Sequence, residues 1–173
     1  MRVLETDRLI LRWMSAGDAP FILELVTEPS WLRFIGDRGV RTPDDAREYI
    51  RKGPVDMYAR LGFGLYLTER KEDGVPIGIC GLLKRESLDD VDLGFANLPR
   101  FWGKGYAYEA ALAVMAYGRS AFGLKRIVAV TSPGNVASVK LLEKLGFRFE
   151  RMVRLSEDSA DVQLFGSDAT GPT

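Results

Sequence analysis

The chain contains 173 residues, with 24 lysines and arginines balanced by 24 aspartates and glutamates, so its formal net charge is zero. This length supports one well-buried core and is short for two, so we expect a single domain over residues 1–173. The balanced charge argues against nucleic acid or a membrane surface as a partner. The absence of histidine excludes serine–histidine hydrolase triads and histidine-ligated metal sites, and we expect no bound metal.

Two further features bear on cellular location. The N-terminal residues lack the apolar core of a signal peptide, and no apolar run approaches the ~20 residues that a bilayer-spanning helix needs. Cys80 is the single cysteine and has no partner for an internal disulfide, so a reducing, cytoplasmic environment is expected. It lies between two apolar runs, which predicts burial as a small hydrophobic residue and no nucleophilic role.

Periodicity and capping residues predict alternating helices and strands. Asp18 and Thr42 are candidate N-caps, each followed within the first turn by a proline, and Gly53-Pro54 is expected to interrupt the second helix. Pro29 is expected to end the first helix, and the small polar residues 166–173 to form a frayed tail. Helices are predicted over residues 19–26, 42–61, 104–122 and 135–145, and strands over residues 8–14, 62–68, 76–83, 91–97, 125–131, 148–155 and 161–165.

The order of these elements predicts a mixed sheet. Charged loops of hairpin length join the three middle strands, which are therefore expected to be antiparallel neighbours. The strand over 91–97, the helix over 104–122 and the strand over 125–131 would form a right-handed βαβ unit. The last of these strands is continuous and β-branched, as is typical of a strand buried on both faces. The fold class is therefore mixed α/β.

A glycine-rich stretch precedes the longest predicted helix. Gly103 and Gly105 lie at the mouth of that helix, where first-turn N–H groups lack intrahelical partners and favour phosphate or pyrophosphate. A P-loop would need serine or threonine after Gly103-Lys104, and glycine follows instead. A dinucleotide fingerprint would need glycine or alanine where Tyr108 stands. Both common nucleotide-binding patterns therefore fail on spacing.

Two motifs resemble those of the GNAT superfamily of N-acetyltransferases. The stretch Trp102-Gly-Lys-Gly-Tyr-Ala107 resembles its acyl-CoA pyrophosphate loop, Gln/Arg-x-x-Gly-x-Gly/Ala, with tryptophan in the first position. That departure is familiar in the branch resembling the enzymes that acetylate ribosomal-protein N-termini. About thirty residues later, Asn135-Val-Ala-Ser138 and the following Leu-Gly146-Phe147 resemble the second motif. The resemblance extends over about residues 4–165 and includes the Thr-Asp-Arg-Leu opening.

The resemblance implies an acetyl-CoA-dependent N-acetyltransferase in which a primary amine, from a protein N-terminus or a small molecule, attacks the thioester directly. It implies a GNAT-like fold: a mostly antiparallel central sheet with flanking helices and a V-shaped splay between two central strands. The pantetheine arm would lie in that splay and bond to backbone groups of the strand over 91–97. The resemblance thus names acetyl-CoA as co-substrate.

Roles for single residues also follow from the resemblance. Asn135 would bond the pantetheine or fix a water molecule, and it is also a candidate helix cap whose amide NH₂ stays free. Ser138 would protonate the departing thiolate, because Leu142 stands where many members carry tyrosine. Asp92 is the candidate general base, with Glu69 as the alternative. The residues expected to bind the co-substrate are Phe95, Ala96, Asn97, Trp102, Gly103, Lys104, Gly105, Tyr106, Ala107, Asn135 and Lys140.

Other interpretations remain open at this point. The chain could acetylate a drug or polyamine, or be a non-catalytic acyl-CoA-binding regulatory module, which the leucine at 142 leaves open. Aromatic side chains of the N-terminal third could contact the acceptor, although core packing is the favoured interpretation for Trp31, Phe34 and Tyr58. Acids at Glu157, Asp158 and Asp161 could favour a cationic acceptor or solubilise a turn. The protein is expected to be a monomer or homodimer.

Overall fold

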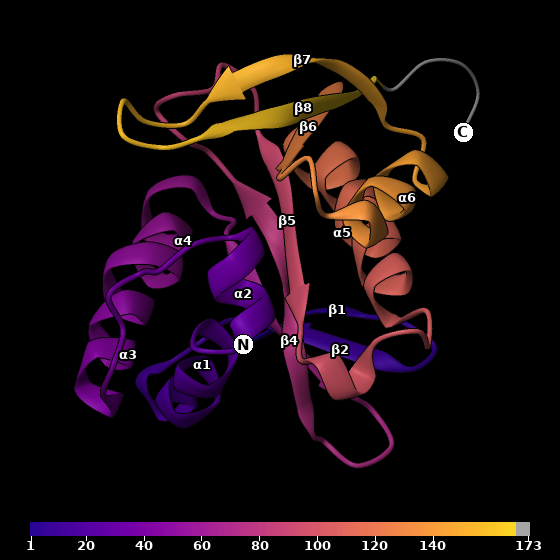
Figure 1. Ribbon diagram of the computed structural model, residues 1–173. Coiled ribbons are helices and arrows are strands. Elements are labelled where there is room, and N and C mark those ends of the chain that lie inside the picture. Colours follow the sequence, from indigo (N-terminus) through magenta and orange to yellow (C-terminus); the bar gives the residue numbers. More distant parts are fainter. Residues whose placement is uncertain (169–173) are drawn as a thin grey trace.

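An eight-stranded sheet runs through the molecule in the order β1-β2-β3-β4-β5-β6-β8-β7 (Figure 1). The computed structural model describes residues 1–168. Neighbouring strands are antiparallel except β5 and β6, which run parallel, so the predicted mixed and mostly antiparallel α/β fold is confirmed. The strands are β1 (Arg2–Glu5), β2 (Leu9–Arg12), β3 (Leu65–Arg70), β4 (Pro76–Leu83), β5 (Asp92–Asn97), β6 (Arg126–Thr131), β7 (Arg148–Arg154) and β8 (Asp161–Asp168).

The helices form two layers, with α1 to α4 on one side of the sheet and α5 and α6 on the other (Figure 1). The long helix α5 packs on β4 and β5 with its small side chains. A Cβ atom at Gly118 would lie 2.9 Å from Leu82 Cδ1, so a larger residue there would displace the Leu82 side chain. The helices are α1 (Ala19–Val26), α2 (Pro29–Phe34), α3 (Pro43–Ile50), α4 (Asp56–Leu61), α5 (Tyr106–Phe122) and α6 (Val136–Lys144).

The parallel strands β5 and β6, at the centre of the sheet, are paired at one position and then diverge. Asp92 is paired with Val128, and the Val128 N–H donates to the Val91 carbonyl at 3.0 Å. Beyond this point β5 continues along β4, whereas β6 continues along β8. The predicted V-shaped splay between two central strands is therefore present, and it leaves one edge of β5 without a neighbouring strand.

Several predicted bounds were wrong for identifiable reasons. Helix α1 does end at Val26, but Pro29 begins α2, since proline is well tolerated in a first turn. Gly53-Pro54 does interrupt the second α-helix as predicted, because a π-helical segment at Arg51–Val55 separates α3 from α4, which continues to Leu61. Gly62 has a φ of +82° and ends α4, which moves β3 to a later start than predicted.

The two ends of the sheet also differ from the prediction. Residues Arg2–Glu5 form β1, an edge strand that the sequence analysis missed. The expected frayed tail is wrong for residues 166–168, because β8 continues through them beside β6 and buries Ser167. The rest of that predicted tail, residues 169–173, lies outside the described residues.

Candidate functional site

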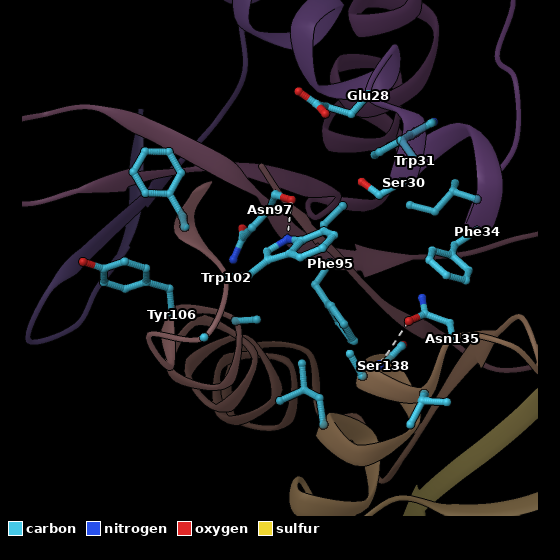
Figure 2. Close-up of a pocket in the computed structure, with 18 of the residues that line it drawn as sticks. Glu28, Ser30, Trp31, Phe34, Phe95, Asn97, Trp102, Tyr106, Asn135 and Ser138 are labelled. Atoms are coloured by element: carbon cyan, nitrogen blue, oxygen red, sulfur yellow. Dashed lines mark hydrogen bonds between the residues drawn. The ribbon is translucent and has the colours of Figure 1, made fainter. Parts of the chain in front are cut away.

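A cavity of about 650 Å³ opens at the splay between β5 and β6. This volume is within the range of small-molecule sites, roughly 300–1,000 Å³. Its walls come from α2, the end of β5, the glycine-rich turn and the first turns of α5 and α6 (Figure 2). The predicted residues that line it are Phe95, Ala96, Asn97, Trp102, Gly103, Gly105, Tyr106, Ala107, Asn135 and Ser138.

The glycine-rich turn presents backbone donors to this cavity. Gly103 and Gly105 have φ angles of +75° and +83°, which are strained for any residue with a side chain. Gly105 is the N-cap of α5, and no side chain caps the helix. The N–H groups of the first turn therefore keep their capacity for a ligand, beside the positive end of a 17-residue helix. This end of the cavity is suited to a phosphate or pyrophosphate group.

A polar cluster braces the turn from outside the cavity. Glu109, in the first turn of α5, accepts hydrogen bonds from Thr6 Oγ1 at 2.5 Å and from Arg8 Nε at 2.7 Å. Arg8 Nη1 also donates to the Lys104 carbonyl at 2.9 Å, and its guanidinium lies over the Tyr106 ring. Burial would raise the pKa of Glu109, but the bonds from Thr6 and Arg8 outweigh it and lower the pKa below its ordinary value. Sequence reasoning assigned no role to this cluster.

Trp102 covers the end of β5. Its side chain is half exposed, and its Nε1 donates to the Asn97 carbonyl at 2.8 Å (Figure 2). This bond occupies one of the two backbone groups of Asn97 on that edge. A ligand that pairs with the free edge of β5 would therefore use Phe95 and the Asn97 N–H.

Asn135 and Ser138 lie together at the first turn of α6. Asn135 Oδ1 accepts from the Ser138 N–H at 3.2 Å, which confirms the predicted N-cap (Figure 2). Within residues 1–168 the Asn135 amide NH₂ donates to no other group, as the capping geometry predicts. Leu142 is fully buried, so the position that carries tyrosine in many GNAT proteins offers no proton donor here.

A second cavity, of about 320 Å³, meets the first at the splay. Both cavities are lined by Phe95, Ala96, Asn135 and Ser138. Asp92 lines the second cavity and is 1% exposed, and its Oδ2 accepts from Arg85 Nε at 3.1 Å. Its Oδ1 has no partner within residues 1–168. Burial raises the pKa of Asp92 despite the opposing charge of Arg85.

The other residues proposed for catalysis or co-substrate binding, and Cys80, lie outside the two cavities. Glu69 pairs with Arg12 at 2.5 Å and lines neither cavity, so the structure does not support it as the alternative base. Lys104 and Lys140 also lie outside both linings, whereas Lys144, which the sequence analysis did not select, lines the larger cavity. Cys80 is buried, as predicted, and burial raises the pKa of its thiol to about 12.

The aromatic residues of the N-terminal third were predicted either to pack in the core or to contact the acceptor, and they differ in their positions. Trp31 and Phe34 line both cavities. Tyr58 is a core residue: it is 3% exposed, stacks on Trp13 at a ring-centroid distance of 4.7 Å, and donates to the Leu65 carbonyl. The favoured core interpretation is therefore correct for Tyr58, and Trp31 is both buried and part of the cavity wall.

Residues 1–168 contain neither a candidate metal site nor a candidate membrane-spanning helix. No cluster of three or more histidine, cysteine, aspartate or glutamate side chains is arranged to hold a metal ion in this part of the chain. Over the same residues, no helix combines the length and apolarity needed to cross a membrane.

A splayed sheet with an uncapped, glycine-rich helix start beside the gap is the arrangement that the resemblance to the GNAT superfamily led us to expect. Residues 8–148 match the family described as "Acetyltransferase (GNAT) domain", and the chain belongs to this family. The predicted family and enzyme class are thereby confirmed.

Individual relatives agree with this assignment. The chain is 32% identical to the "Uncharacterized N-acetyltransferase YoaA" of Bacillus subtilis (strain 168), over 88% of this chain and 86% of that protein. It is 29% identical to the "[Ribosomal protein uS5]-alanine N-acetyltransferase" of Escherichia coli (strain K12), over 85% of this chain and 78% of that protein. The solved "Ribosomal L7/L12 alpha-N-protein acetyltransferase in complex with Coenzyme A" has the same fold, with a TM-score of 0.82, 19% identity and coverage of 98% and 100%.

Proposed function

We propose that this single-domain protein is an acetyl-CoA-dependent N-acetyltransferase in which a primary amine attacks the thioester directly. The observation that carries the proposal is the uncapped start of α5, with Gly103 and Gly105 at positive φ, opening into the cavity at the β5–β6 splay. N–H groups from Gly103 to Ala107 would hold the pyrophosphate of CoA. The cavity volume and the free edge of β5 fit the pantetheine arm.

The backbone of β5 supports this placement of the arm. Because Val91 bonds to β6, strand alternation turns the backbone groups of Leu93, Phe95 and Asn97 toward the splay. Trp102 occupies the Asn97 carbonyl, which leaves the N–H and C=O of Phe95 and the N–H of Asn97 for the ligand. Bonds to these groups would extend the sheet by one strand. An N–H donor here would polarise the thioester carbonyl.

The reaction removes two protons from the protonated amine nitrogen and supplies one to the leaving sulfur. The amine nitrogen bonds to the thioester carbonyl carbon, the carbon–sulfur bond breaks, and sulfur leaves with the bonding electrons. The acceptor arrives as an ammonium, so two protons must leave its nitrogen. We propose that Asp92 takes the first proton before attack, directly or through water, and that the second leaves the nitrogen after attack and replaces the proton given to sulfur. Ser138, which lines both cavities, would protonate the leaving sulfur, and the Asn135 NH₂ would bond the arm or fix a water molecule.

A non-catalytic acyl-CoA-binding module is the second candidate function. The observation that favours it is the buried Leu142 at the position of the tyrosine in many GNAT proteins. Release of CoA thiol with a panel of amines separates the two candidates, because a binding module would hold acetyl-CoA without turnover. A cytoplasmic location and a monomeric or homodimeric state remain predictions.

Calorimetric titration with acetyl-CoA tests the proposal. We expect micromolar binding to the wild type and loss of binding in Gly105→Glu, and absence of wild-type binding would refute the proposed function. Ser138→Ala should lower kcat ten-fold or more, about 1.4 kcal/mol per decade, with unchanged acetyl-CoA affinity. Equal turnover in Ser138→Ala would remove this hydroxyl from the mechanism.

A further inference from the structure

The smaller cavity has an excess of positive charge. Its charged lining residues are three arginines, Arg33, Arg38 and Arg85, and one carboxylate, Asp92, so three positive charges less one negative leave a surplus of two. Arg85 is engaged with Asp92 at 3.1 Å. Within residues 1–168, Arg33 and Arg38 have no ion-pair partner, and both are exposed. The surplus therefore lies with Arg38, which lines the smaller cavity alone, and with Arg33, which also lines the larger cavity.

Neighbouring acids do not cancel this charge. Asp37 stands next to Arg38 in the chain, but its carboxylate pairs with Arg41 at 2.5 Å. The turn between β7 and β8 contains Glu157 and Asp158, yet the residues of that turn in the lining are Leu155, Ser159 and Ala160. The possibility of a cationic acceptor, raised by the acids of this hairpin, therefore has no support in the cavity wall.

The lining of the smaller cavity also includes a buried hydrogen-bond acceptor and a buried donor, neither of which has a partner within residues 1–168. Asp92 lies beside the splay, where Phe95, Asn135 and Ser138 belong to both cavities. Its Oδ1 is a buried acceptor without a partner, suited to an amine or an intervening water molecule. Trp31, which is 5% exposed, supplies a donor, because its Nε1 is buried and has no hydrogen-bond partner within residues 1–168. The cavity thus offers an acceptor for an amine, and donors and cations for an anion.

We infer that the amine acceptor carries a carboxylate close to its amino group, and that Arg33 and Arg38 select for it. This inference rests on the proposed function, because it assigns the smaller cavity to the acceptor. The shared chemistry belongs to a free amino acid and to a peptide with acidic side chains near its N-terminus. A guanidinium recognises both carboxylates, since its planar donors match their two oxygens.

Product binding tests the inference without requiring turnover. One pair of ligands is N-acetyl-serine and N-acetyl-serinamide, and the other is the amides of N-acetyl-Ser-Asp-Asp and N-acetyl-Ser-Lys-Lys. Calorimetry at low salt, with and without saturating CoA, should show the anionic member of at least one pair binding about ten-fold tighter. The first pair identifies a small acceptor and the second a peptide. The preference should fall as salt rises.

Charge reversal assigns the preference to residues. Arg38→Glu should lower the ratio of binding of the anionic ligand to that of its matched partner by about ten-fold, and Arg33→Glu with Arg38→Glu by more. Glu157→Lys is the matched control, a reversal of the same size on the neighbouring turn, and should change the ratio less than two-fold. Arg38 lines the smaller cavity alone, so the acetyl-CoA affinity of Arg38→Glu should be unchanged.

Different results would overturn the inference and the proposed function. A wild-type ratio near one, a preference for the cationic ligands, an unchanged ratio in Arg38→Glu, or weakened acetyl-CoA binding in that variant would overturn the inference. Absence of acetyl-CoA binding and of thiol release would refute the proposed function instead. The product-binding ratio of the protein without CoA would still decide the ligand class in that case.

Discussion

Substituting alanine for Gly105 tests whether the backbone of the glycine-rich turn holds a phosphate. Gly105 has a φ of +83°, and a Cβ atom there would lie 3.3 Å from Arg8 Nη2, the flexible end of a side chain. The main effect of alanine is therefore backbone strain, about 1–2 kcal/mol for a residue in the left-handed region. The turn can relieve that strain by rotating, which would turn its N–H groups away from the cavity.

The structure provides a matched control at the other end of the same helix. Gly123 follows α5 with a φ of +66°, and a Cβ atom there would meet no atom within 4 Å. Gly123→Ala should cost a similar ~1–2 kcal/mol of unfolding free energy. It should leave acetyl-CoA binding unchanged, since this end of the helix lines neither cavity.

The expected loss of acetyl-CoA affinity in Gly105→Ala follows from the hydrogen bonds that the turn would make to the pyrophosphate. A hydrogen bond to a charged group contributes about 1.5–3 kcal/mol. Misalignment of one N–H in Gly105→Ala should therefore weaken acetyl-CoA binding by about ten-fold to over one hundred-fold. Calorimetric titration gives the affinity and denaturant unfolding gives the stability. If both variants lose equal stability and Gly105→Ala binds as tightly as Gly123→Ala, the assignment of the pyrophosphate to this turn is wrong.

Three further predictions concern titratable groups. The acid limb of the pH–rate profile should lie above the ordinary aspartate pKa of 3.8 and disappear in Asp92→Asn, because burial raises the pKa of Asp92; an unaltered profile would exclude this base. The lowered pKa of Glu109 stabilises the fold above the ordinary value of 4.5, so unfolding free energy should fall as pH drops below it. Denaturant unfolding of Glu109→Gln should show a shallower fall, and an identical pH dependence would argue against the brace with Arg8. Thiol reagents should label Cys80 on unfolding alone, and alkylation of the folded protein that abolishes turnover would contradict its inert role.

Some features could be predicted because their causes lie within a few residues along the chain. The positive φ angles of Gly103 and Gly105 belong to a short turn, and glycine is the residue that adopts them without strain. The cap of α6 joins Asn135 to Ser138, three residues away, so its spacing is visible in the sequence. The bounds of α1 and β4 were also predicted correctly: α1 has Pro20 in its first turn, although the Asp18 side chain makes no capping hydrogen bond, and β4 is a short apolar run.

Other features could not be predicted because they join distant segments. The bond from Arg8 to Glu109 spans 101 residues, and the sequence alone does not reveal that β2 lies beside the start of α5. Local pattern selected Lys140, yet the orientation of α6 against the sheet brings Lys144 to the cavity instead. Strand β1 has no strong pattern of its own and forms through its pairing with β2.

The chain by itself determined the family, through two motifs, and the glycine-rich turn and the capped Asn135–Ser138 pair, which depend on short-range backbone geometry. The tertiary structure decided which charges face the cavities. Asp92 meets Arg85, Glu69 is held by Arg12, and Arg33 and Arg38 reach the smaller cavity without ion-pair partners within residues 1–168. Charges act through space rather than along the chain, so their effect depends on packing that no local pattern records.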